Sequence, residues 1–337
     1  MPTSFSQNPK VFVTRKLPRS VERRLSDLFD ATLNVFDVAL SREALIEAVQ
    51  NCDVFVPTVT DRIDADIINA AGDQLKLIAN FGAGTDHIDV AAAYARGITV
   101  TNTPGVLTED TADLTMALIL AVPRRLVESD RLTRDGGFDG WKPTGILGHR
   151  VRGKKVGIIG MGRIGQAVAR RANAFGLIVN YHNRRRLATT TEDGLSAIYW
   201  DDLDAMLSAV DIVSINCPST PSTHHLINAE RLKKMSKDSY IVNTARGDII
   251  DEDALADALA SGQIGGAGLD VYEHEPKINP KLMTLPNVIL TPHIGSATHE
   301  SRQEMGEKVM INIRAMLDHH ACPDRVLPPR LSLSEAS

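Results

Sequence analysis

Cysteine and aromatic residues are scarce in this 337-residue chain. Its three cysteines are Cys52, Cys217 and Cys322, and aromatic residues make up 4% of the sequence. Cysteines that are few, odd in number and far apart in sequence do not suit a disulfide framework or a zinc site. We therefore expect reduced thiols and a cytoplasmic location.

Long apolar runs and an excess of positive charge are missing as well. No stretch reaches the roughly 18 apolar residues of a membrane-spanning helix, and residues 1–16 lack the apolar core of a signal peptide. The formal net charge is -5, so no basic surface for nucleic acid is expected. The histidine pairs at 224–225 and 319–320 have no companion ligands at suitable spacing, so we expect no metal site.

Short β-rich runs alternate with helical patterns along most of the chain. They lie at 11–13, 33–36, 54–56, 77–79 and 98–100, and again at 156–159, 177–181, 212–215, 240–243, 266–269 and 288–290. This alternation predicts an α/β protein with parallel sheets covered by helices. We predict two doubly wound domains, a Rossmann-type dinucleotide-binding domain inserted in a flavodoxin-like domain.

The domain boundaries follow from two long helical patterns. One, at 107–122, separates the two series of strands, and the other, at 298–319, comes after the second series is finished. We expect the last helix to return to the first domain. The predicted assignment is residues 1–103 with 296–337 in one domain and 104–295 in the other, and the tail at 321–337 is expected to be loosely structured.

A glycine-rich hexad at residues 160–165 (GMGRIG) follows an apolar run and opens a helical pattern. Gly160 would permit the tight strand-to-helix turn, Gly162 would let a pyrophosphate approach the backbone, and Gly165 would let the helix pack on the sheet. The first amides of that helix would face the negative charge. The alternative is a purely structural turn, but the strand before it and the helix after it favour a dinucleotide site.

The second strand of this motif ends without a carboxylate. NAD binders place an acidic residue about 20 residues after the hexad to accept the ribose 2′-hydroxyl, whereas this chain has Asn183 followed by Arg184, Arg185 and Arg186. Guanidinium groups can bind a 2′-phosphate in a bidentate manner. We therefore expect NADP(H) to be preferred, with NAD(H) a weaker alternative, and Arg184 and Arg185 to discriminate between them; a solvated run of surface charge is the other interpretation.

Three residues that follow late strands suggest the chemistry. Reduction of a 2-oxo acid needs a cation for the carboxylate, a proton donor for the carbonyl oxygen and a partner for that donor. Arg246 can supply the cation, His293 can donate a proton near neutral pH, and Glu275 can support the imidazolium. Each residue alone is also typical of ordinary loops, but ligands bind where strands end in open α/β sheets.

The chain resembles the D-isomer-specific 2-hydroxyacid dehydrogenases. Besides the hexad, the segments that carry the resemblance are 81–89 (FGAGTDHID), 102–105 (NTPG), 216–218 (NCP), 243–247 (NTARG), 268–273 (GLDVYE) and 292–296 (PHIGS). Within that family, residues 181–184 (YHNR) are similar to the glyoxylate and hydroxypyruvate reductases, which favour NADPH.

The resemblance implies a role for each matching residue. Arg246, Glu275 and His293 would be the catalytic group. The substrate would be bound by Ala83, Gly84, Arg246, His293, Ser296 and Trp141. The cofactor would be bound by Gly160, Gly162, Arg163, Ile164, Gly165, Asn183, Arg184, Arg185, Cys217, Pro218, Thr244, Ala245 and Asp270. The segment around Trp141 is similar to an arm that crosses a homodimer in the reductases; its alternative is packing within the chain.

We therefore predict a cytoplasmic, homodimeric, NADPH-preferring reductase of glyoxylate or hydroxypyruvate. One alternative is a reductase of bulkier 2-oxo acids such as phenylpyruvate, which pocket size would decide. Another is a dinucleotide-sensing regulator on the same scaffold, because the resemblance extends to the C-terminal-binding-protein corepressors. No nucleic-acid or membrane partner is expected.

Overall fold

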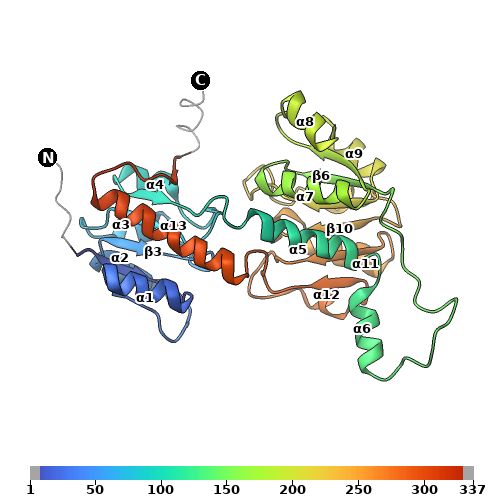
Figure 1. Cartoon of the computed structure of the whole chain (residues 1–337), viewed down its shortest axis with the longest axis horizontal. Helices are drawn as coiled ribbons and strands as arrows, with labels where there is room; N and C mark the ends of the chain where they lie inside the picture. The colour runs from blue at the N-terminus through green and yellow to red at the C-terminus, as the bar shows by residue number, and fades with distance from the viewer. Residues whose placement is uncertain (1–7, 329–337) are drawn as a thin grey trace. The chain divides into compact units, whose positions relative to one another are not determined.

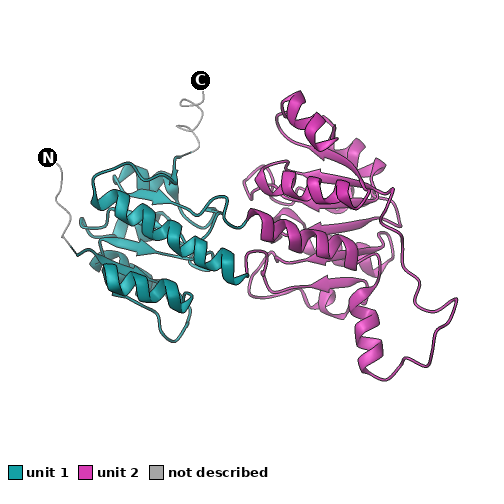
Figure 2. Cartoon of the chain, viewed as in Figure 1, with its two compact units in different colours: residues 1–107, 298–337 teal, residues 108–297 magenta. Residues whose placement is uncertain are grey.

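The computed structural model describes residues 8–328. The chain forms two compact units, one built from Met1–Leu107 with Thr298–Ser337 and the other from Thr108–Ala297 (Figure 2). The chain thus leaves unit 1, completes unit 2 and then returns. No helix within the described part is both long and apolar enough to cross a bilayer.

Unit 1 contains a six-stranded sheet in the order β13-β5-β4-β3-β1-β2, and Figure 1 labels its five helices α1 to α4 and α13. Its strands are β1 (Lys10–Val13), β2 (Asp30–Thr32), β3 (Val54–Val56), β4 (Leu77–Ala79), β5 (Thr99–Thr101) and β13 (Arg325–Val326). Its helices are α1 (Arg19–Leu28), α2 (Arg42–Asn51), α3 (Ala65–Ala70), α4 (Val90–Ala95) and α13 (His299–Leu317). The parallel order 2-1-3-4-5 is that of flavodoxin-like folds.

Side chains of the unit 1 strands point alternately to the two faces of the sheet and pack in two apolar layers. Val54, Val56 and Leu77 pack with α1 and α13 on one face, whereas Phe55 and Ile78 pack with α2, α3 and α4 on the other. Both faces of the sheet are therefore covered, which explains why its strands are almost entirely apolar.

Two expectations about unit 1 are wrong. The strand expected at 33–36 lies earlier, at β2 (Asp30–Thr32), and Val35 and Phe36 are exposed in the loop that follows. The apolar pattern was misleading because those side chains have no apolar layer to face. The tail is not uniformly loose either, because β13 (Arg325–Val326) pairs antiparallel with β5; the rest of it from residue 329 lies outside the described residues.

Unit 2 contains a seven-stranded sheet in the order β12-β11-β10-β9-β6-β7-β8. Its strands are β6 (Lys155–Ile159), β7 (Ile178–His182), β8 (Ile198–Tyr199), β9 (Ile212–Ile215), β10 (Tyr240–Asn243), β11 (Gly266–Leu269) and β12 (Val288–Leu290). Its helices are α5 (Thr108–Ala121), α6 (Leu126–Arg134), α7 (Arg163–Ala174), α8 (Thr189–Leu195), α9 (Leu203–Ala209), α10 (Ala229–Leu232), α11 (Glu252–Ala260), α12 (Pro280–Thr284) and the 3-10 turn η1 (Gly247–Ile249).

Every pairing in this second sheet is parallel. Counted from β6, the order is 3-2-1-4-5-6 with one further strand, which is the order of a Rossmann-type dinucleotide-binding fold. The loops after β6, β7, β9, β10, β11 and β12 therefore emerge at the same edge of the sheet. The residues predicted to be catalytic lie on three of these loops.

Candidate active site

The three glycines of the hexad occupy positions with different structural requirements. Gly160 follows β6 with a φ of +96°, and an added Cβ would lie 2.5 Å from the Cys217 nitrogen. A Cβ on Gly165 would lie 2.2 Å from the Gly160 oxygen, so α7 could not approach β6 as closely. A Cβ on Gly162 would meet nothing within 4 Å. The turn is therefore tight behind Gly160 and open at the start of α7, and the first amides of a helix are a general binding place for anions.

Asn183 holds this turn in place from the neighbouring strand. The Met161 backbone N–H donates to the Asn183 side-chain oxygen at 2.7 Å, and the Gly160 N–H donates to the carbonyl of His182 at 3.0 Å. Sequence reasoning expected Asn183 to contact the cofactor and missed this supporting role. The role depends on pairing between β6 and β7, which spacing along the chain does not reveal.

The three consecutive arginines have different surroundings. Arg186 makes an ion pair of 2.8 Å with Glu192 on α8, whose side chain is 6% exposed. Arg184 and Arg185 are exposed, and within residues 8–328 neither has a carboxylate partner. Burial raises the pKa of Cys217 to about 11, and the charge of Arg184 opposes that rise. The Arg184 charge thus acts on the thiol next to the glycine-rich turn.

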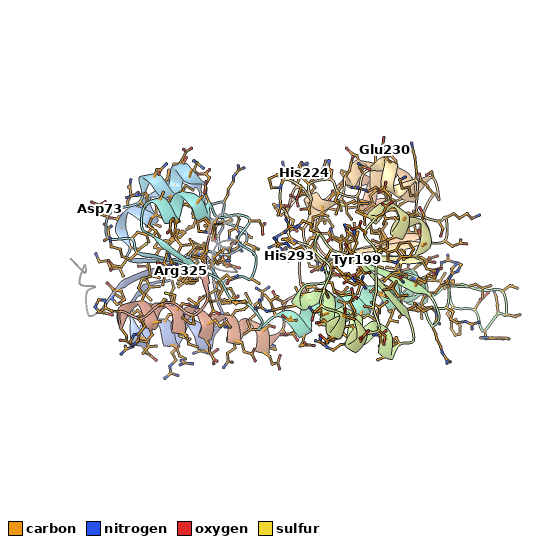
Figure 3. The ribbon with its side chains drawn as sticks, turned by 90° about the horizontal axis from the view of Figure 1, so that it is seen from above. Asp73, Tyr199, His224, Glu230, His293 and Arg325 are labelled. Atoms are coloured by element: carbon orange, nitrogen blue, oxygen red, sulfur yellow. The ribbon has the colours of Figure 1, made fainter. Side chains whose placement is uncertain are left out.

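His293 and Glu275 form a hydrogen-bonded pair on adjacent loops. Glu275 follows β11 and His293 follows β12. The Nδ1 of His293, which is labelled in Figure 3, lies 2.9 Å from the Glu275 Oε2. Burial acts to raise the pKa of Glu275, but the hydrogen bond and charge of His293 and the charge of Arg246 lower it overall. An ionised carboxylate only accepts, so Nδ1 carries the proton and Nε2 remains for a substrate.

Asp270 shapes the loop that carries His293. This fully buried carboxylate accepts from the backbone N–H groups of Ile294 and Gly295, both at 2.8 Å, and from the Thr291 hydroxyl at 2.6 Å. The His293 N–H donates to the Asp270 carbonyl at 2.9 Å. His293 has a φ of +54°, a left-handed conformation that costs about 1–2 kcal/mol. The Asp270 hydrogen bonds hold it there.

Arg246 lies on a short loop between β10 and η1. The Asn243 side chain accepts from the Ala245 N–H at 3.0 Å and donates to the Arg246 carbonyl at 2.7 Å. A Cβ on Gly247 would lie 1.8 Å from the Tyr272 carbonyl carbon, so this loop rests on the chain leading to Glu275. Asn243 and Gly247 are thus positioning residues that flank the predicted arginine.

The other residues predicted in unit 2 lie on the same loops or on α7. The Thr244 hydroxyl is 2.7 Å from that of Thr115 on α5, and Pro218 follows Cys217 after β9. Arg163 is exposed in the first turn of α7, whereas Ile164 packs against the apolar core. Ser296 is half-buried beyond the His293 loop.

Ala83 and Gly84 lie in unit 1, in the loop after β4. The carbonyls of Gly82 and Gly84 accept from the Asn80 side-chain amide at 3.0 and 2.8 Å, and the carbonyl of Ala83 accepts from Asn102 at 2.7 Å. These hydrogen bonds fix the carbonyls of the loop and leave them already paired. The two asparagines were not predicted, although each directly follows a buried strand.

Trp141 does not pack within the chain, so that alternative is wrong. Its side chain is 85% exposed, and every residue from 130 to 150 is exposed. Together with α6 (Leu126–Arg134), these residues form an arm at 126–150, in which the apolar side chains of Leu126, Phe138 and Leu147 are exposed too. A segment with this many exposed large apolar groups needs a covering surface.

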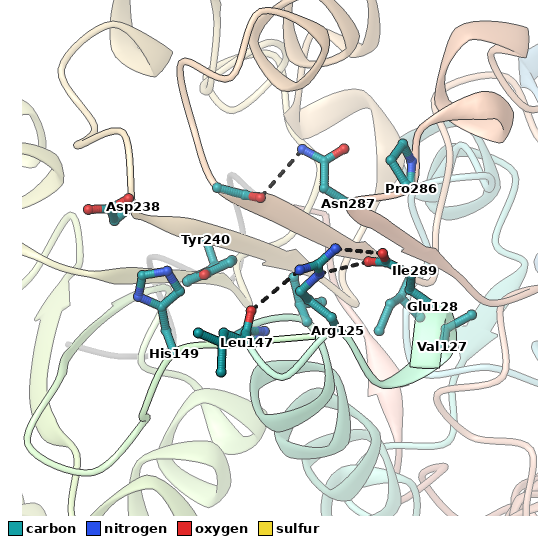
Figure 4. Close-up of a pocket in the computed structure, with 13 residues that line it drawn as sticks. Arg125, Val127, Glu128, Leu147, His149, Asp238, Tyr240, Pro286, Asn287 and Ile289 are labelled. Atoms are coloured by element: carbon teal, nitrogen blue, oxygen red, sulfur yellow. Dashed lines mark hydrogen bonds and ion pairs between the residues drawn. The ribbon is translucent and has the colours of Figure 1, made fainter. Parts of the chain in front are cut away.

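A pocket of about 330 Å³ lies elsewhere in unit 2 (Figure 4). It is lined by Tyr240 and Asn287, which stand at the amino-terminal ends of β10 and β12, and by Arg125 and Glu128. These two charged groups pair with each other through two hydrogen bonds of 2.8 and 2.5 Å. The pocket is therefore at the opposite edge of the sheet from His293, and we do not assign the chemistry to it.

The fold and this site together define a dinucleotide-binding α/β oxidoreductase. Comparison with known families agrees: residues 116–295 match the model of the D-isomer specific 2-hydroxyacid dehydrogenase, NAD binding domain. A glyoxylate reductase of Thermococcus litoralis is 43% identical over 322 residues, covering 94% of this chain and 96% of that protein. The chain belongs to the family of D-isomer-specific 2-hydroxyacid dehydrogenases, which are NAD(P)-dependent enzymes.

Solved structures of similar proteins support the same assignment. A glyoxylate reductase from Paecilomyes thermophila has a TM-score of 0.85 and 34% identity, covering 98% of this chain and all of that one (100%). An NADPH-dependent glyoxylate/hydroxypyruvate reductase from Sinorhizobium meliloti, in complex with NADP and malonate, has a TM-score of 0.83 and 35% identity. The match covers 95% of this chain and 97% of that one.

Proposed function

We propose that this enzyme reduces glyoxylate or hydroxypyruvate to glycolate or D-glycerate, with NADPH as the preferred reductant. The observation that carries the proposal is the His293–Glu275 hydrogen bond with the Arg246 charge acting on the same carboxylate. An imidazole, a carboxylate and a guanidinium are the groups that proton donation to a carbonyl next to a carboxylate requires. The similar proteins named as glyoxylate reductases favour this substrate class.

Each residue has a separate task in the proposed reaction. Arg246 binds the substrate carboxylate and the carbonyl oxygen, and His293 gives its Nε2 proton to that oxygen. Glu275 stabilises the imidazolium before this transfer and keeps the ring oriented. The nicotinamide, when bound, supplies the hydride that adds to the carbonyl carbon. His293 then regains a proton from solvent.

The proposal includes a binding role for the unit 1 loop. The backbone N–H groups of Ala83 and Gly84 bind the substrate carboxylate in this scheme. The bonds from Asn80 and Asn102 to the carbonyls of the loop support it, because they fix the peptide orientation. No side-chain charge is needed for such a site.

The cofactor preference is also part of the proposal. Arg184 and Arg185 are exposed after β7, where a carboxylate would repel a 2′-phosphate. The Sinorhizobium meliloti protein, which is 35% identical, is named as NADPH-dependent and was crystallised with NADP. Asp270, Thr244 and Cys217 then contribute to the dinucleotide site through the loops they shape or line.

We further propose that the enzyme is a cytoplasmic homodimer. The exposed apolar arm around Trp141 is the part of the chain that a second copy would cover. Trp141 itself is proposed to contact the substrate of the second copy. The three free cysteines suit a reducing compartment.

The central experiment measures steady-state rates with glyoxylate, hydroxypyruvate, pyruvate and phenylpyruvate, each with NADPH and with NADH. Glyoxylate and hydroxypyruvate should be the best substrates, and each should be reduced faster with NADPH than with NADH. His293→Ala should lower kcat by at least about a hundredfold and leave NADPH binding intact, because proton donation is lost and the nucleotide contacts are not.

Other results of this experiment would contradict the proposal. Faster turnover of phenylpyruvate would make this a reductase of bulkier acids. Tight NADH binding with no turnover of any acid would favour a dinucleotide-sensing regulator. Full activity in the His293→Ala protein would remove His293 from the mechanism.

A further inference from the structure

Three loops of unit 2 meet at His225. This residue lies on the segment after β9, Arg246 lies on the segment after β10, and Glu275 lies on the segment after β11. No part of the proposed reaction uses His225. Its contacts nevertheless join the two segments that carry Arg246 and Glu275.

The backbone of His225 is fixed in an unusual conformation. Its φ is +48°, and its N–H donates to the Asp248 carbonyl at 2.8 Å. Ile227, two residues later, forms a parallel bridge with Ile250. The segment after β9 is thereby paired with the segment that starts at Arg246. A positive φ is uncommon for residues other than glycine, so this pairing is what holds His225 in it.

The side chain of His225 reaches the third segment. Its Nε2 lies 2.8 Å from the Glu273 Oε1, and the Glu273 side chain is only 17% exposed. Because a carboxylate accepts, the imidazole nitrogen is the donor. His224, labelled in Figure 3, packs its ring against that of His225 with the centroids 4.1 Å apart. The imidazole therefore contacts both the Glu273 carboxylate and the His224 ring.

Glu273 links directly to both proposed catalytic segments. Its backbone nitrogen would lie 2.3 Å from a Cβ on Gly247, the residue after Arg246, so the two segments touch here. Its own N–H donates to Glu252 on α11 at 2.7 Å. Glu275 follows two residues later and accepts from the Tyr272 N–H at 3.0 Å. A shift of Glu273 would therefore be transmitted to Glu275 and to the Arg246 loop.

We propose that His225 and Glu273 form a positioning pair that holds Arg246 and Glu275 in the geometry needed for proton donation by His293. The pair does not contact the substrate in this proposal. It acts by fixing the segments on which the reacting groups lie. The inference depends on the proposed roles of Arg246, Glu275 and His293.

The positioning role predicts a loss of turnover without a loss of nucleotide binding. Glu273→Ala removes the acceptor, and His225→Asn removes the ring while keeping a residue type that tolerates a left-handed backbone. Each change should lower kcat for the best 2-oxo acid by about tenfold, because small misplacement of reacting groups is costly. The dissociation constant for NADPH, measured by fluorescence, should stay within about twofold.

Two further variants separate positioning from general folding support. Glu273→Gln keeps a carbonyl oxygen for the imidazole and should recover at least about half of the lost activity. The double variant His225→Asn with Glu273→Ala should be no slower than the slower single variant, because residues that act through one contact are not additive. Lys281→Ala, which breaks an exposed 2.8 Å ion pair with Asp257 in the same unit, is the matched control and should keep full activity.

The results that would overturn the inference differ from those that would overturn the proposed function. Failure of the wild-type enzyme to reduce any 2-oxo acid would defeat the proposed function. An active wild type with unchanged kcat per nucleotide-binding site in both single variants would defeat the positioning role alone. Losses of kcat that multiply in the double variant would also defeat it. So would losses of kcat that are fully explained by a lower melting temperature of the variant.

Discussion

Arg184, Arg185 and Arg186 are consecutive in the chain but do not have equal freedom to bind a phosphate. Arg186 is committed to Glu192, whereas Arg184 and Arg185 are exposed after β7. The basic run was visible in the sequence. Which of its members was already neutralised was not, because Glu192 belongs to a later helix.

This difference predicts a selective change in cofactor preference. Replacing Arg184 and Arg185 together with Ala should raise KM for NADPH about tenfold to a hundredfold, since charge-assisted hydrogen bonds contribute about 1.5–3 kcal/mol. KM for NADH should stay within about threefold. Lys281→Ala, which removes an exposed ion pair with Asp257, is the control and should leave the ratio of the two KM values unchanged. Equal weakening of both cofactors in the double variant would exclude phosphate recognition.

Contacts between segments that are distant in sequence could not be predicted at other residues of the site either. Arg246, Glu275 and His293 were predicted because their residue types and strand-end positions fit one reaction. The supporting roles of Asn183 and Asp270 were not predicted, since each depends on contacts between loops that are distant in sequence. A sequence pattern therefore predicts the reacting residues more readily than the residues that position them.

At the scale of elements, α8 is attached to the end of β7 by a buried polar cluster. The Glu192 carboxylate on α8 accepts from the Tyr181 hydroxyl and from Arg186, and the Tyr181 oxygen also accepts from the Leu187 N–H at 3.0 Å. The hydrogen bonds from Arg186 and Tyr181 hold the pKa of Glu192 below its ordinary value of 4.5. The loop with the two exposed arginines is thus anchored at its far end.

The lowered pKa of Glu192 predicts a pH-dependent stability difference. A carboxylate with a lowered pKa in the folded state stabilises the fold above its unfolded-state pKa, and this contribution is lost as pH falls through the folded value. Arg186→Met should therefore be less stable than wild type above about pH 5, and the gap should narrow as pH falls below 4.5. Urea unfolding at several pH values would measure it; a gap that is constant with pH would contradict the assignment.

Strand prediction matched the strands in the interiors of the two sheets, and its failures lie at sheet edges. The apolar runs that became β3, β4, β9 and β10 lie in sheet interiors. The run at 33–36 is equally apolar but ends in a loop with Phe36 85% exposed. The short β13 was missed because two residues give no periodic pattern.

At the scale of the whole molecule, the arm that includes α6 leaves its large apolar side chains exposed. Helix α6 has no buried residue, and Trp141 beyond it is exposed. The sequence alone suggested this arm only through resemblance to the reductases.

We therefore expect the arm to be needed for dimer formation. The chain mass is 36.6 kDa, so light scattering of the intact protein should give twice that value. Replacing residues 130–146 with a short glycine–serine linker should give a monomer, because the apolar area that the second copy would cover is removed. A monomeric intact protein, or a shortened protein that remains dimeric, would contradict the expectation.

The division of unit 1 into two stretches of sequence has a consequence for synthesis on the ribosome. The apolar layer around Val11, Leu25 and Leu77 includes Met305, Val309 and Ile313 of α13. These helix residues are translated only after all of 108–297 has been made. Domains usually fold in the order of their translation. Here unit 2 is fully translated while the apolar core of unit 1 still lacks the side chains of α13. The nascent chain must therefore keep the first hundred residues soluble until translation is almost finished.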